Sequence, residues 1–164
     1  MTNLTEDNKH NVELLKQLAY ESFPNNKLMA DLTIVQGILE GGLEYYREPS
    51  QLALKYNNLF GIKARDDEKN STQSVYLATT EYPTPNHMIS VYQWFRKFDS
   101  LEDCLERRKE LFTLERYSNL WNALNFYSIA NLVRQDGYAT DPEYSKELIE
   151  VYNRYVSDQT NNIK

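Results

Sequence analysis

Glu40 closes an apolar run and stands directly before Gly41 and Gly42. A carboxylate at a helix C-terminus meets the negative end of the helix dipole, and apolar surroundings solvate its charge poorly. Both effects disfavour the ionised form and raise the pKa of the carboxyl group. Glu40 could then act as a general acid near neutral pH. The alternative is a solvated terminal glutamate followed by a glycine helix stop.

Glu81 is a second candidate, at the end of a β-branched stretch that predicts a strand. Hydrolysis of a glycosidic bond usually needs two carboxylates across a cleft, and a glutamate on a strand could face one on a helix end. A surface strand residue is the alternative for Glu81. Tyr138 comes just before the last helix, where its hydroxyl could point into a groove or its ring could act as a hydrophobic staple.

Composition excludes several classes of function. A net charge of −6 without a basic stripe argues against nucleic-acid binding and against attraction to anionic membranes. No stretch reaches the roughly 18 apolar residues of a membrane span. One cysteine, Cys104, and two histidines do not suit a zinc site, so we expect no metal or cofactor and interpret Cys104 as a packing residue. Thirteen tyrosines suit a sugar-binding groove, or equally a Tyr-rich core and surface.

Apolar spacing and turn residues predict the elements that would position these side chains. The first helix is expected from Thr5 or Asn8 to about residue 22, and the second at about 27–40 with Asn25 or Asn26 as its N-cap. A short third helix should begin at Pro49 or Ser50, and a fourth at Ser100. A fifth is expected at about 119–134, and the last should follow an N-cap at Asp141. A hairpin follows the run 66–68, which we interpret as a solvated loop. We therefore predict one domain over residues 1–164. It is α+β but mainly α, with a small antiparallel β-lobe at about 65–98 and a polar lead-in at 1–8.

Several short motifs occur in a fixed order: residues 36–40 (QGILE), 50–53 (SQLA), 57–63 (NNLFGIK), 79–82 (TTEY), 95–100 (FRKFDS) and 138–144 (YATDPEY). Together they resemble the bacterial glucosaminidase family, glycoside hydrolase family 73, which comprises peptidoglycan hydrolases of flagellar, autolysin and phage origin. The resemblance covers about residues 28–155. It implies a lysozyme-like helical domain with a β-lobe, in which Glu40, Glu81 and Tyr138 are the catalytic residues.

The sequence departs from the family directly after Glu40. The family usually continues with Ser-Gly-Trp-Gly, whereas residues 41–44 are Gly-Gly-Leu-Glu, and we expect Tyr45 or Tyr46 to replace the lost stacking surface. The asparagine pair at 57–58 is interpreted mainly as part of the turn that shapes the cleft. The residues expected to bind substrate are Tyr45, Tyr46, Asn58, Phe60 and Tyr82.

The resemblance implies cleavage of the β-1,4 bond after N-acetylglucosamine in peptidoglycan, by an endo-β-N-acetylglucosaminidase. Alternatives are a muramidase or lytic transglycosylase in the same cleft, or an inactive glycan-binding or structural homologue. The polar N-terminus is not a secretory signal peptide, so we expect synthesis in the cytoplasm. We expect a phage lysin or virion-associated lysin, which would reach the wall after holin-type release or as part of a virion with phage structural proteins as partners. We expect a monomer, with neither nucleic-acid binding nor membrane insertion.

Overall fold

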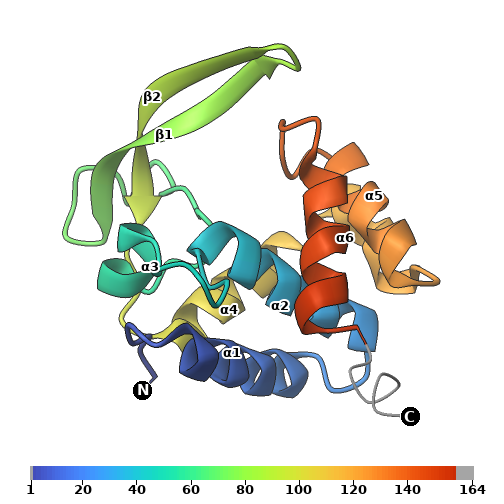
Figure 1. The fold of residues 1–164 in the computed structure, drawn as a ribbon. Coiled ribbons are helices and arrows are strands. Elements are labelled where there is room, and N and C mark those ends of the chain that lie inside the picture. The colour runs from blue at the N-terminus through green and yellow to red at the C-terminus, as the bar shows by residue number, and fades with distance from the viewer. Residues whose placement is uncertain (1, 158–164) are drawn as a thin grey trace.

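The computed structural model describes residues 2–157, which form a mainly helical body and one β-hairpin (Figure 1). The predicted α+β class with a small antiparallel β-lobe is confirmed. In chain order the elements are α1 (Asn8–Ser22), α2 (Lys27–Gly41), α3 (Gln51–Tyr56), β1 (Ser74–Thr84), β2 (His87–Arg96), α4 (Leu101–Leu111), the 3-10 helix η1 (Glu115–Asn122), α5 (Phe126–Gln135) and α6 (Tyr144–Tyr155).

Helix α2 forms the centre of the body and packs against α1, α5 and α6. Its residues 29–38 are all buried, as expected for a helix that is apolar on nearly every side. Gly37 permits the close approach of α1, because a Cβ there would lie 2.6 Å from Leu15 Cδ2. Gly42 caps the helix in the left-handed region with φ 71°, so Glu40 is held at the end of a rigid, buried element.

Side-chain caps set most of the helix starts. Asn26 accepts a hydrogen bond from Met29 N and Ser100 from Asp103 N, as predicted, and Ser50 caps α3. The N-cap of α1, however, is Asp7 rather than Thr5 or Asn8. Asn8 is used elsewhere, because its amide nitrogen donates to the carbonyl oxygens of Gly42, Glu44 and Arg47.

Two helix predictions near the C-terminus were wrong in extent. The helix expected at 119–134 is divided into η1 and α5 by an extended turn at Ala123, and Leu124 in this turn is 90% exposed. Asn125 starts α5 by accepting from Ser128 N. The last helix begins at Tyr144, with Glu143 as N-cap, because Asp141 Oδ1 accepts from Glu143 N inside a preceding turn.

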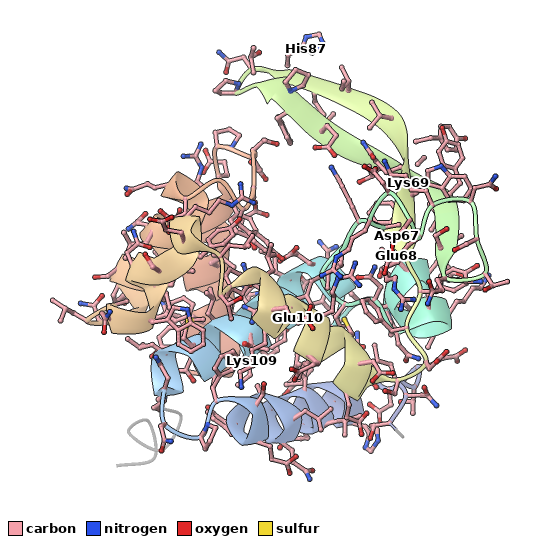
Figure 2. All side chains as sticks on the ribbon, turned by 180° about the vertical axis from the view of Figure 1, so that it is seen from behind. Asp67, Glu68, Lys69, His87, Lys109 and Glu110 are labelled. Atoms are coloured by element: carbon pink, nitrogen blue, oxygen red, sulfur yellow. The ribbon has the colours of Figure 1, made fainter. Side chains whose placement is uncertain are left out.

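The β-lobe is a two-stranded antiparallel hairpin that rises above the helical body (Figure 1). Glu68, expected in a solvated loop, is instead buried at the base of the lobe, with a relative exposure of 7%. Its carboxylate pairs with Arg107 of α4 at 2.7 Å and with Arg96 of β2 at 3.0 Å. Figure 2 shows Glu68 where the lobe meets α4. The polar residues around Glu68 in the sequence predicted a solvated loop, because the two arginines that it pairs with lie 28 and 39 residues away.

Candidate active site

A cleft of about 1000 Å³ lies between the β-lobe and the helical body. Residues from α2, the turn after α3, β1, α4 and the α5–α6 loop line it. Five of the eight residues predicted for the site share this cleft: Glu40, Phe60, Glu81, Tyr82 and Tyr138. The structure therefore brings together the helix-end carboxylate and the strand carboxylate, which are 41 positions apart in the sequence.

Glu40 is held by two phenol groups. Tyr144 donates a hydrogen bond to Glu40 Oε2 at 2.8 Å, and Tyr138 donates to Oε1 at 3.3 Å. Burial raises the pKa of Glu40 to about 8, against the opposing effects of Tyr144, Arg108 and Tyr138. The direction is the one expected from sequence, although burial is the principal cause. At neutral pH the carboxyl group is therefore mostly protonated and able to give up a proton.

Tyr138 and Tyr144 are themselves fixed by ring packing. Tyr138 lies in the loop between α5 and α6, directly after Gly137, whose φ of 95° turns the chain. Its ring stacks between Phe112 and Tyr144, with centroid distances of 5.7 and 5.9 Å. Burial raises the pKa of both phenols well above 10, so both remain hydrogen-bond donors to Glu40.

Tyr144 is a site residue that sequence reasoning missed. In sequence it shares a helical spacing with Leu148, Tyr152 and Tyr155, which indicates the apolar face of the last helix. The available signal was its place at the end of the motif at 138–144, three residues after Asp141. Because α6 starts at Tyr144 itself, its side chain projects from the first turn of the helix onto the end of α2.

Glu81 occupies a different environment on the β-lobe side of the cleft. It lies on β1 opposite Ile89 of β2. Its side chain is 30% exposed and forms an ion pair with Lys63 Nζ at 3.0 Å. Unlike Glu40, it has a cationic partner.

The turn at 57–63 supports the cleft floor. Asn58 is buried, donates to the carbonyl oxygens of Ile62 and Arg96 at 2.9 Å each, and accepts from Ile62 N. These bonds tie the turn to the base of β2, so Asn58 has a scaffold role and is not among the residues that line the cleft. Phe60 and Tyr82 do line it, one from the floor and one from the lobe.

Tyr45 and Tyr46 do not replace the stacking wall expected beside Glu40, because neither lines the cleft. Tyr45 packs edge-on against Tyr155 at 4.9 Å, and Tyr46 is 70% exposed and donates to Glu44 Oε2. Asn8 explains this outcome. Its bonds to three carbonyl groups of the segment 42–47 fold that segment toward α1 and α6.

The described residues include no group of three or more His, Cys, Asp or Glu side chains that could hold a metal ion. Within the same residues, no helix is both long and apolar enough to cross a bilayer. Cys104 is fully buried on α4, and burial raises the pKa of its thiol to about 12. The packing role predicted for Cys104 agrees with this position.

The glucosaminidase family model, described as mannosyl-glycoprotein endo-beta-N-acetylglucosaminidase, matches residues 16–157. The exo-glucosaminidase LytG of Bacillus subtilis (strain 168) is 26% identical over 149 residues, which are 87% of this chain and 49% of that protein. The chain thus spans about half the length of this curated relative.

Two solved structures share the fold. A peptidoglycan hydrolase mutant from Sphingomonas sp. A1 is 27% identical, with a TM-score of 0.61 over 76% of this chain and 79% of that one. A C-terminally truncated glycoside hydrolase domain of Salmonella typhimurium FlgJ is 26% identical, with a TM-score of 0.59 over 91% and 95% of the two chains. With a family model that matches nearly the whole described chain, this protein belongs to the glucosaminidase family of glycoside hydrolases.

Proposed function

We propose that this domain hydrolyses the β-1,4 bond after N-acetylglucosamine in the glycan strands of peptidoglycan, as an endo-β-N-acetylglucosaminidase. The observation that carries the proposal is Glu40, a carboxyl group with a pKa of about 8 in a cleft that also holds Glu81. Relatives named as a peptidoglycan hydrolase and an exo-glucosaminidase support the substrate class.

In this mechanism Glu40 gives its proton to the leaving oxygen as the glycosidic bond breaks. Glu81 takes a proton from a water molecule, whose hydroxyl adds to the anomeric carbon, or it stabilises the oxocarbenium-like charge. Tyr138 positions the 2-acetamido group or the water. The alternative nucleophile is the oxygen of the substrate's own acetamido group, in which case Glu81 would act on charge alone.

The distribution of charge across the cleft favours this division of roles. Glu40 is partly buried and has no ion-pair partner among the described residues, whereas Glu81 is paired with Lys63 and partly exposed to water. Two carboxyl groups whose environments differ in this way are suited to an acid and a base role, respectively. Tyr82 supplies a ring surface on which a sugar could stack, whereas Phe60, with 3% relative exposure, supports the cleft floor.

The test is a digest of purified cell walls with the wild-type domain and with Glu40→Gln. We expect Glu40→Gln to lose lysis by about 10²–10⁴-fold while keeping its fold by circular dichroism. Near-normal lysis by that variant would overturn the assignment of Glu40. Lack of lysis by the folded wild-type domain would instead indicate an inactive glycan-binding homologue.

Mass spectrometry of the same digest identifies the bond. A new reducing end at N-acetylglucosamine supports the proposal, whereas one at N-acetylmuramic acid indicates a muramidase and an anhydro product a lytic transglycosylase. Release of single sugars rather than longer fragments would indicate exo rather than endo cleavage.

We also propose that the domain serves as a phage lysin or virion-associated lysin, which stays a prediction from sequence. Its test is expression in a host whose wall the purified domain digests, with and without a co-expressed holin. Lysis that requires the holin supports the lysin role. Lysis without it would show that the chain reaches the wall by another route.

A further inference from the structure

Arg108 on α4 is the largest fully buried side chain of the described residues, with 1% relative exposure. None of the ion pairs among these residues includes it. Its guanidinium lies 5.0 Å from the ring centroid of Phe60 and 4.4 Å from that of Phe112. A buried cation without an anionic partner is costly, and packing alone does not account for one that lies against Phe60, a residue of the cleft lining.

The hydrogen bonds of Arg108 lead to Glu40 through two residues. Nε and Nη2 donate to Gln36 Oε1 at 3.2 and 2.5 Å. Gln36 Nε2 donates to the Tyr144 hydroxyl at 2.9 Å, and that hydroxyl donates to Glu40 Oε2 at 2.8 Å. The remaining guanidinium contact is to Thr33 Oγ1 at 2.6 Å, whose own proton goes to Met29 O.

The direction of this chain of hydrogen bonds follows from its first member. A guanidinium has only donors, so the carbonyl oxygen of Gln36 must face Arg108 and its NH₂ group must face Tyr144. The Tyr144 oxygen therefore accepts from Gln36, and its single proton is left for Glu40. Replacing the cation would remove the constraint, because a side-chain amide and a phenol can each bond in either direction.

We propose that Arg108 is a positioning residue that acts through Gln36 and Tyr144, so that the Tyr144 hydroxyl donates its hydrogen bond to Glu40 Oε2. Glu40 Oε1, which receives only the longer hydrogen bond of 3.3 Å from Tyr138, against 2.8 Å from Tyr144 to Oε2, then carries the acidic proton that is delivered to substrate. This inference rests on the proposed role of Glu40 as the general acid. It adds two residues to the machinery, Gln36 and Arg108, that do not themselves line the cleft.

Electrostatics act in the same direction as the hydrogen bonds. The charge of Arg108 and the Tyr144 hydrogen bond both favour ionised Glu40 and so oppose the effect of burial on its pKa. The other charged groups that line the cleft with Glu40 are Lys63, Arg65, Glu81, Arg107, Glu110, Arg116 and Asp141. None of the cations in this set joins the chain of hydrogen bonds to Glu40. Arg108 differs from them because it both favours ionised Glu40 through its charge and sets the direction of the hydrogen bonds.

The deciding variant is Gln36→Glu, tested by NMR titration of the ¹³C-labelled Glu40 carboxyl group in the resting protein. The new carboxylate would neutralise Arg108 and accept the proton of Tyr144, so Glu40 would lose both influences. We expect the Glu40 pKa to rise by about one unit or more, and to rise likewise in Arg108→Met and Tyr144→Phe. The alkaline limb of the kcat profile should move up with it, with kcat reduced about tenfold and KM little changed.

The control is Val151→Ala, which creates a cavity on α6, the helix that carries Tyr144, without touching the chain of hydrogen bonds. It should lower stability and leave both the Glu40 pKa and the alkaline limb in place. A Glu40 pKa that stays within about 0.3 unit in folded Gln36→Glu overturns the proposal, even if Arg108→Met fails to fold. An active Glu40→Gln variant would overturn the proposed function instead, without affecting this titration.

Discussion

The two carboxylates of the cleft, Glu40 and Glu81, differ in almost every physical respect. Glu40 ends a buried helix, accepts from two phenols, and has a pKa raised to about 8 by burial. Glu81 lies on a two-stranded hairpin, is partly exposed and pairs with Lys63. The helical body thus presents a protonated carboxyl group, Glu40, and the lobe presents a partly exposed carboxylate paired with a cation, Glu81. Acid–base hydrolysis requires this asymmetry.

The largest effect is expected from Glu68→Gln at the base of the lobe, and it is an effect on the stability of the fold that brings the lobe carboxylate to the cleft. Two arginines and the backbone of Arg65 hold the Glu68 carboxylate, with Arg107 as the main cause of a pKa lowered to about 2. Breaking such a buried network should lower the free energy of unfolding by about 3–5 kcal/mol. Urea denaturation at pH 7 measures the loss.

The pH dependence of that loss has a defined sign. Because the folded pKa of Glu68 lies below its unfolded value, its stabilisation is present above about pH 4.5 and disappears as the pH falls toward about 2. Wild type and Glu68→Gln should therefore converge in stability in acid. A difference that stays constant from pH 7 to pH 2.5 would contradict an ionic anchor.

Glu81→Gln should reduce kcat by about 10²-fold, if Glu81 acts as the base toward water. Lysis rates on purified walls measure the loss, with Lys63→Met as the matched variant that keeps the carboxylate. A loss of less than about tenfold would favour the acetamido group as nucleophile and would limit Glu81 to electrostatic stabilisation.

Glu40→Gln should separate stability from activity. The folded pKa of Glu40 lies above its unfolded value, so the wild-type protein loses stability as the pH rises from about 4.5 through about 8. The amide cannot ionise, so the inactive variant should be about 4 kcal/mol more stable relative to wild type at pH 9 than at pH 5. Thermal unfolding at both pH values tests this, and an equal difference at the two would contradict a buried acid.

The smallest effect is expected from Lys63→Met. The pair with Glu81 is largely solvent-exposed, with Lys63 53% and Glu81 30% exposed, so its loss should cost less than about 1 kcal/mol of stability. A larger loss in chemical denaturation would show that the lobe depends on this pair rather than on Glu68.

Features set by neighbours in sequence could be predicted, and those set by distant partners could not. The caps at Asn26 and Ser100, the helix that ends after Glu40 and the hairpin all follow from local patterns. The anchoring role of Glu68 and the fold of the segment after Gly42 depend on Arg107 and Asn8, which are 39 and 34 residues away. The local patterns instead predicted a solvated loop at Glu68 and a stacking surface for the cleft at Tyr45 or Tyr46.

The same distinction applies to the candidate site. Glu40, Glu81 and Tyr138 could be proposed because each belongs to a short motif that is visible in the sequence. Arg108 could not, since it reaches Gln36 across 72 residues and has no motif of its own. A buried arginine on an amphipathic helix is indistinguishable in sequence from the exposed charged residues around it.

The most direct test of the account is the titration of the Glu40 carboxyl group by ¹³C NMR in the wild-type protein. We predict a single midpoint near pH 8, matched by the alkaline limb of the lysis profile. A midpoint near the ordinary glutamate value of about 4.5 would mean that Glu40 is ionised at neutral pH and would contradict its role as the proton donor.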